Sequence, residues 1–362
     1  MKLLDFFRYE REFVDFVEGS LINEPYTFFN PINWEYEKKI FFEKWAKGKN
    51  YEPNFEYKKV DVEKYFEKLD HYYDLFSKIK NRELSSLYCD KINELRIFLN
   101  TIKYAGTKNF TKFSQEAYGK PNFFNYILAR IVVMLHSSSP NENYISSKEI
   151  SKLFTDFCEE KHISDWKLDF NDEIPSIAFI NSKQRVLSIN NRINHTKVDF
   201  VRLLRHEIGV HATRYYNGSK ILSIFALGLA RYDELEEGLA TFNESGIKDF
   251  IDISYMPALK YIAVYHSLKN DFSKTYKLIY DLTGDKELSF SIVLRSKRGT
   301  KDNVGSYTKD ALYFSGYLKV ILLNIYGKSK MDEAFIGKIG FKDFNKIKKI
   351  MDYLTNLKTD EC

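Results

Sequence analysis

Apolar side chains recur every three or four residues through most of the chain, which is the spacing of one face of an α-helix. Residues 62–80 and 83–103 are clear examples of the pattern. Breaks that contain glycine or proline follow at 104–107 and at 118–121. The pattern predicts an N-terminal helical region, residues 1–140. Its many aromatic side chains fit the core of such a region better than they fit a ligand groove.

The alternating pattern of a half-buried strand is convincing in one region only. It occurs at 166–170, and short apolar runs follow at 176–180 and 186–189. Together these segments predict a sheet of two to four strands directly before a further helix. We therefore expect a mostly helical α+β fold with a small antiparallel or mixed sheet.

Residues 137–143, Ser-Ser-Ser-Pro-Asn-Glu-Asn, are the best linker candidate in the chain. They would separate the helical region 1–140 from a second domain, 141–362, which contains the sheet and the C-terminal helices. A chain of 362 residues is long enough for one large domain or two modest ones.

The helix after the sheet has a start and a stop that can be read from the sequence. Thr196 with Asp199 three residues later is a capping box, and Asn217-Gly218 is expected to end the helix in a left-handed turn. An almost wholly apolar helix, 221–230, and a third helix that begins near Asp233 should follow.

This capped helix carries the motif His206-Glu207-Ile208-Gly209-Val210-His211. A catalytic zinc ion takes three protein ligands from His and Asp or Glu and leaves one position for water. His206 and His211 are the natural nitrogen ligands. Glu207, adjacent to the first of them, is placed to take a proton from the metal-bound water and to pass it to the leaving amine.

The two histidines are five residues apart, whereas the familiar H-E-x-x-H motif has them four apart. On a regular α-helix, positions five apart differ by about 500°, which is roughly 140° off a common face. One wide π-type turn would return both rings to one side, and Gly209 lies where such a distortion costs least. Alternatively the helix ends early and His211 lies just beyond it. We favour the wide turn, because the helical pattern continues to Tyr216.

The third ligand is expected from Glu236 or Glu237, which point about 100° apart on a helix, so that only one can face the metal. We choose Glu237 and assign Glu236 to a histidine N–H or to Arg231. Gly238 and Ala240 should let this helix approach the histidine helix closely. The alternative is a surface helix with accidental histidines. Three features argue against that alternative: the helix has a cap, a sheet precedes it, and the acidic segment 236–240 follows it.

Composition limits the setting of such a site. The chain is 44% hydrophobic, and its 55 basic and 50 acidic side chains leave a net charge of only +5, which indicates neither a nucleic acid nor a membrane partner. Three widely spaced cysteines argue against a disulfide framework and favour a reducing compartment. No apolar run approaches the roughly 18 residues of a membrane span, and the N-terminus gains charges too early for a secretory signal. We expect a soluble, cytoplasmic protein.

The two motifs, His206 to His211 and Glu236 to Ala240, resemble those of the microtubule-associated tyrosine carboxypeptidase family, whose bacterial relatives are known as QEGLA-motif proteins. The likeness runs from about residue 60 to residue 330, and segment 298–316 looks like the family's C-terminal signature. The resemblance implies a zincin-like fold with a zinc ion as cofactor. It implies that His206, His211 and Glu237 hold the zinc and that Glu207 is the catalytic glutamate.

The resemblance also implies a metallocarboxypeptidase that removes a C-terminal residue, tyrosine or another aromatic residue among the candidates, from a peptide or protein. Such an enzyme needs a cation to hold the free carboxylate of its substrate. From the basic segment 295–309 we choose Arg298 and Lys309, because both lie in the family-like signature. Tyr313 is a further catalytic candidate, for polarising the scissile carbonyl. The strand at 186–189 is a candidate edge for an extended substrate.

Two alternatives stay open. The same site could serve a zinc endopeptidase or amidase, or the zinc could only stabilise a non-enzymatic interaction protein. Glu207 argues against the second, because a purely structural zinc site has no use for a base. The chain has no long basic N-terminal extension of the kind that could hold a microtubule, so the sequence alone does not support tubulin as the substrate.

Overall fold

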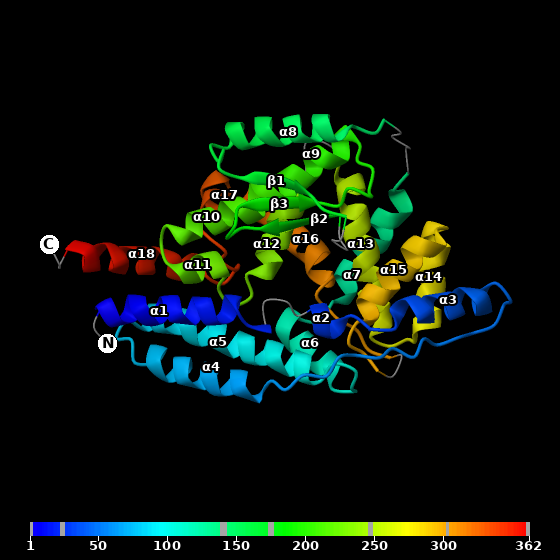
Figure 1. The fold of residues 1–362 in the computed structure, drawn as a ribbon, viewed down its shortest axis with the longest axis horizontal. Coiled ribbons are helices and arrows are strands. Elements are labelled where there is room, and N and C mark those ends of the chain that lie inside the picture. Colours follow the sequence, from blue (N-terminus) through cyan, green and yellow to red (C-terminus); the bar gives the residue numbers. More distant parts are fainter. Residues whose placement is uncertain are drawn as a thin grey trace.

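The computed structural model describes residues 3–21, 26–137, 143–172, 177–244, 249–301 and 304–359, and it is mostly helical with one small sheet (Figure 1). The N-terminal part holds seven helices: α1 (Leu3–Glu18), α2 (Tyr26–Phe29), α3 (Trp34–Trp45), α4 (Glu63–Phe76), α5 (Arg82–Lys103), α6 (Phe110–Tyr118) and α7 (Phe123–Leu135).

The middle part holds the sheet and the helices around the two motifs. These elements are α8 (Ser147–Glu160), β1 (Lys167–Phe170), β2 (Ala178–Asn181), β3 (Val186–Ile189), α9 (Lys197–His206), the π-helical turn η2 (Glu207–Ala212), α10 (Thr213–Ser219), α11 (Ser223–Leu227) and α12 (Asp233–Asn243). The C-terminal part is helical: α13 (Phe250–Ser267), α14 (Phe272–Thr283), α15 (Lys286–Lys297), α16 (Ala311–Ile325), α17 (Lys328–Ala334) and α18 (Phe344–Thr359). This composition confirms the predicted α+β class. No helix among the described residues is long and apolar enough to cross a membrane.

The largest group of buried apolar side chains joins the N-terminal helices to later ones. Phe13 of α1 and Leu95 of α5 share it with Ile224 of α11, Leu235 of α12 and Ile350 of α18. In Figure 1, α1, α4 and α5 run side by side along one side of the molecule. The domain division near residue 140 stays a prediction, and the linker predicted at 137–143 falls mostly outside the described residues.

A second group of buried side chains joins α3 and α7 to the C-terminal helices, through Phe41, Ala129, Ile262 and Tyr276 among others. A third group packs α8 and α9 against the sheet. Phe154 of α8 and Phe200 of α9 meet Leu187 and Ile189 of β3 in it. This third group holds the first half of the histidine helix in a fixed position on the sheet.

The sheet has the order β1-β3-β2, with β3 parallel to β1 and antiparallel to β2. Leu187 of β3 pairs with Leu168 on one side and with Ile180 on the other. The prediction that the strand at 186–189 offers a free edge is therefore wrong, because its backbone groups pair on both sides. The outer edges of the sheet belong to β1 and β2.

The predicted cap at the start of the histidine helix is confirmed. The Thr196 hydroxyl accepts a hydrogen bond from the backbone N–H of Asp199 at 3.1 Å, and it donates to the Asp199 carboxylate at 2.8 Å. The predicted stop at Asn217-Gly218 is wrong, because α10 continues to Ser219. Gly218 keeps a helical backbone. A Cβ there would collide with the backbone of Phe225, so this glycine lets α11 pack closely.

The apolar helix predicted at 221–230 is also shorter than expected. α11 covers only Ser223–Leu227 and ends at Gly228, which has a φ of 108°. Its apolar residues reflect burial in the core and not a long helix. The third helix begins at Asp233, as predicted.

Candidate metal centre

The histidine motif lies on a widened helical turn. α9, η2 and α10 follow one another without a break, and η2 is a π-helix that contains Gly209 and His211. The Thr213 hydroxyl donates to the carbonyl of Ile208, five residues earlier, at 2.9 Å. This confirms the predicted wide turn and rules out the early helix end. It also explains how histidines five apart come to share one side of the helix.

Gly209 has a second role in this turn. A Cβ at this position would collide with the side-chain amide of Asn243, which donates to the carbonyl of Arg205 at 2.7 Å. The glycine therefore leaves room for a residue of α12 to reach the backbone of the histidine helix. This contact holds the helices of the two motifs together.

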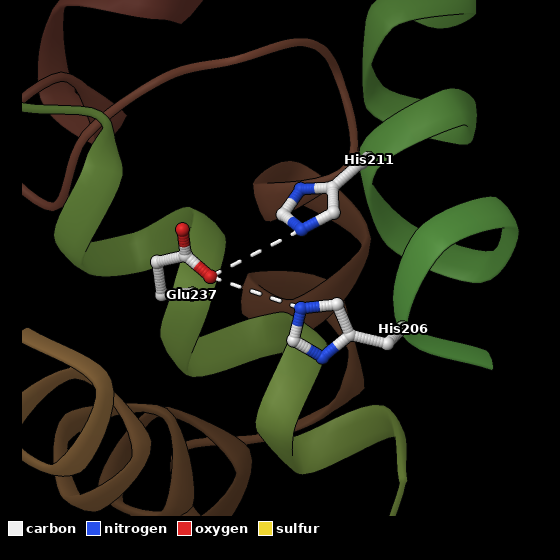
Figure 2. A group of neighbouring side chains, drawn as sticks. All are labelled: His206, His211 and Glu237. Atoms are coloured by element: carbon white, nitrogen blue, oxygen red, sulfur yellow. Dashed lines mark ion pairs between the residues drawn. The ribbon is translucent and has the colours of Figure 1, made fainter. Parts of the chain in front are cut away.

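The structure brings His206, His211 and Glu237 together (Figure 2). Glu237 Oε2 lies 3.8 Å from Nε2 of His206 and 4.0 Å from Nε2 of His211. One ligand atom from each of the three residues lies within 4.8 Å of the other two. This is the only such group of His, Cys, Asp or Glu side chains among the described residues.

Glu236 is not part of this group, and its carboxylate contacts the other ring nitrogen of His211. Its Oε1 lies 2.8 Å from Nδ1 of His211, and its Oε2 accepts a hydrogen bond from the buried guanidinium of Arg214. Of the two predicted partners for Glu236, the histidine is found. The cation beside it is Arg214 and not Arg231. Arg214 also donates to the carbonyls of Ala334 at 2.9 Å and Ile339 at 2.7 Å, which fixes its position.

His206 has a matching arrangement that the sequence reading missed. Its Nδ1 lies 2.9 Å from Oε1 of Glu244, and Oε2 of Glu244 accepts two bonds from Arg202, at 2.6 and 2.9 Å. Glu244 lies seven residues beyond Glu237, which is two helical turns, so the two acids lie on the same side of α12. That spacing is the signal that could have identified Glu244.

Each histidine thus presents its Nε2 to Glu237 while a carboxylate engages its Nδ1. A carboxylate on one ring nitrogen fixes the orientation and tautomer of an imidazole and makes the other nitrogen a better ligand. Arg202 and Arg214 hold these two carboxylates in place. The arrangement leaves three donor atoms facing one common point.

The carboxylates govern the protonation of the group. Burial lowers the pKa of His206, but the hydrogen bond to Glu244 and the charges of Glu207, Glu244 and Glu237 outweigh burial and raise this pKa to about 9. Burial raises the pKa of Glu236, but Arg214 and His211 outweigh it and lower this pKa to about 2. Glu207 therefore lies close enough for its charge to act on the His206 ring, and its role as the catalytic base stays a prediction.

Gly238 does not provide the predicted close approach to the histidine helix. It faces α16 and not the histidine helix, because a Cβ there would collide with the backbone of Gly316. The two glycines have no side chains, so the backbones of α12 and α16 come into direct contact. The close contact places α16 directly behind the helix that carries Glu237.

The basic segment 295–309 is committed largely to structure. Arg295 forms two bonds with Asp310, at 2.7 and 2.8 Å. Lys297 is buried and donates to three backbone carbonyls, those of residues 267, 270 and 305. Lys309 forms an ion pair with Asp233 at 3.2 Å.

The remaining two predicted residues are both half-buried. Arg298 follows the last residue of α15, and its charge helps to lower the pKa of Asp310. Tyr313 lies on α16, with the ammonium of Lys260 4.9 Å from its ring centroid. Their roles in substrate binding and catalysis stay predictions.

Comparison with known proteins adds a family. The family described as microtubule-associated tyrosine carboxypeptidase matches residues 39–354. A mouse protein named putative tyrosine carboxypeptidase MATCAP2 is 26% identical over 155 residues, which are 41% of this chain and 30% of the mouse protein. A rat protein named microtubule-associated tyrosine carboxypeptidase 1 is 24% identical over 156 residues, 40% of this chain and 32% of the rat protein. The matched segments thus span less than a third of the length of these relatives.

Proposed function

Because the chain belongs to the microtubule-associated tyrosine carboxypeptidase family, we propose that it is a zinc-dependent carboxypeptidase. We propose that it removes one residue from the C-terminus of a peptide or protein. The observation that carries the proposal is the group formed by His206, His211 and Glu237, with a carboxylate on the second nitrogen of each histidine. A zincin-like relationship of the fold is part of the same proposal.

The three donor atoms fit a zinc ion. Ligand atoms around a tetrahedral zinc with bonds of about 2.0–2.2 Å stand roughly 3.3–3.6 Å apart. The carboxylate oxygen of Glu237 lies 3.8 and 4.0 Å from the two Nε2 atoms, and all three donor atoms lie within 4.8 Å of one another. The side chains would therefore have to move closer by up to about 1 Å to hold the ion. Two imidazoles and one carboxylate are also a donor set that catalytic zinc sites use, and they leave a position for substrate or water.

Zinc, when bound, would supply Lewis acidity, which lowers the pKa of a water molecule and polarises a carbonyl group. The chain's own residues do the rest. His206, His211 and Glu237 hold the ion, and Glu236 and Glu244 keep the two rings oriented. Glu207 accepts a proton from the attacking water and returns it to the leaving amine. Tyr313 is proposed to stabilise the charge that develops on the scissile carbonyl oxygen.

The names of the relatives refer to tyrosine and to microtubules. For this chain we propose only a preference for an aromatic C-terminal residue, such as tyrosine. Tubulin is not proposed as the substrate. The cytoplasm is the proposed compartment, since the cysteines and the mild net charge fit it.

Mass spectrometry of a peptide library incubated with the protein tests the reaction type. We expect loss of single C-terminal residues, fastest where that residue is tyrosine or phenylalanine. Internal cleavage would favour an endopeptidase, and release of ammonia from peptide amides would favour an amidase. A library that stays intact in the presence of zinc would favour the non-enzymatic alternative.

Metal analysis of the purified chain tests the ligand set separately. One zinc per chain is expected for the wild type, and much less is expected for His206→Ala. A variant that keeps its zinc would show that His206 does not hold it. His71→Ala is the matched control, because His71 lies on α4 and belongs to no such group.

A further inference from the structure

A carboxypeptidase must hold the free carboxylate of its substrate about one residue beyond the scissile carbonyl, a distance of roughly 3.6 Å along the chain. The holding cation must therefore lie close to the metal ligands. Most cations of the basic segment already have partners: Arg295 binds Asp310, Lys297 binds three carbonyls, and Lys309 binds Asp233. A cation outside this segment is better placed.

We propose that Lys260 is the residue that binds the terminal carboxylate of the substrate. Lys260 lies in the middle of α13. This inference rests on the proposed carboxypeptidase function and adds a residue that belongs to neither sequence motif.

Lys260 lies on a helix that is linked by packing to the helix of Glu237. α13 packs on α16, and the ammonium of Lys260 lies 4.9 Å from the ring centroid of Tyr313 on that helix. One turn further along α16, Gly316 touches Gly238, the residue after Glu237. Lys260, Tyr313 and Glu237 therefore come from three helices that pack in sequence, and Tyr313 is a proposed catalytic residue itself.

Lys260 has no counterion among the residues that the structure describes. Lys260 is half-buried, and with the described residues it forms neither an ion pair nor a hydrogen bond. Its aromatic contact with Tyr313 is a weak substitute for hydration. A cation withdrawn from water without a counterion is costly, and buried charges are as a rule paired, so a carboxylate ligand would offset this cost.

The charges around Lys260 agree with its position and its lack of a counterion. Burial and the charge of Arg295 lower the pKa of Lys260, while Asp310, Glu237 and Glu244 act in the opposite direction. Lys260 is thus near enough to the metal ligand Glu237 to interact with its charge. A substrate carboxylate would supply the negative charge that Asp310 cannot give, because Asp310 is held by Arg295.

The ligand class is a carboxylate at a peptide C-terminus, and a pair of peptides isolates it. The two peptides have the same sequence, and one ends in a free acid and the other in an amide. The wild type should cleave the acid in strong preference to the amide. In Lys260→Met, kcat/KM for the acid should fall by at least about 30-fold, mostly through a higher KM. This factor is the smallest effect expected when one partner of a buried charge pair is removed. The preference for the acid should largely disappear.

Lys319→Met is the matched control. Lys319 lies on α16 and pairs with Glu234 at 2.5 Å, and its loss should leave both peptides unaffected. Lys309→Met and Arg298→Met test the rival cations. If either of these abolishes the preference while Lys260→Met keeps it, the assignment of Lys260 is wrong.

Two further measurements separate this proposal from its premise. The zinc content of Lys260→Met should equal that of the wild type, and its thermal stability should be equal or higher, since the variant removes a cation that is costly to keep from water. A large loss of either would make Lys260 a structural residue and overturn the proposal. Calorimetric binding of both peptides to zinc-loaded Glu207→Gln protein, with and without Lys260→Met, needs no turnover. If the wild type cleaves nothing, the proposed function fails, and this binding comparison still decides the role of Lys260.

Discussion

Replacement of Glu244 by glutamine tests how the site controls its metal. The Glu244 carboxylate lies 2.9 Å from Nδ1 of His206 and contributes to raising the pKa of that ring to about 9 in the metal-free protein. Zinc must displace this proton. Its apparent affinity in the wild type should therefore rise about tenfold per pH unit up to about pH 9.

Glu244→Gln changes two quantities in opposite directions. Loss of a carboxylate behind a ligating histidine costs about 10–100-fold in metal affinity, and this loss should be seen in full above pH 9. At the same time the pKa of His206 falls towards its ordinary value of about 6.5, so proton competition weakens at lower pH. The plot of log affinity against pH should then bend near pH 7 and not near pH 9, and the two proteins should differ little at pH 7.

Competition with a chromophoric chelator between pH 6 and pH 9.5 measures both curves. Glu234→Gln is the control, since Glu234 lies on the same helix but pairs with Ser315 and Lys319. Its curve should match the wild type. Parallel curves for Glu244→Gln and the wild type would refute the role of Glu244 in setting the protonation of His206.

Three further predictions concern stability. Glu236→Gln should destabilise the protein by about 3–5 kcal/mol in urea at pH 7, because it leaves the buried Arg214 without its counterion. Because the pKa of Glu236 is lowered, its contribution to the stability of the folded protein should be full above about pH 4.5 and should be lost as pH falls towards about 2. A stability that stays constant between these pH values would contradict this. The pKa of His206 is raised, so chelator-treated protein should lose up to about 3 kcal/mol of stability as pH rises from 6.5 to 9, and a flat melting temperature there would count against it. Gly209→Ala should destabilise by about 1–3 kcal/mol through its collision with Asn243, and by clearly less in an Asn243→Ala background, as a double-mutant cycle would measure.

The local features of the site could be predicted because they depend on short spacings. The five-residue histidine spacing, together with a helical pattern that continues to Tyr216, predicts a wide turn, and the structure has that turn at η2. Glu237 and Glu236 point apart because they are adjacent on a helix. The cap at Thr196 follows from the preference of hydroxyl side chains for free backbone N–H groups at helix starts.

The features that were missed depend on which elements meet in space. The apolar pattern of a strand does not encode strand order, so it cannot show that β3 is central in the sheet. The glycine at position 238 predicts a close helix contact, but its partner is α16, about 80 residues further along the chain, and not the histidine helix. Arg214 depends on a contact with Glu236 that no local spacing indicates. The seven-residue spacing places Glu244 on the side of Glu237, but only the structure shows that Glu244 meets His206.

His206, His211 and Glu237 are proposed to form a metal-dependent catalytic site with Glu207 as its base. The most direct test is Glu207→Gln, with zinc content and C-terminal cleavage of one tyrosine-ending peptide measured on the same sample. We expect one zinc per chain, as in the wild type, with turnover reduced by at least about 100-fold. Full activity in Glu207→Gln, or a wild type that cleaves the peptide equally well after its metal is removed, would contradict it.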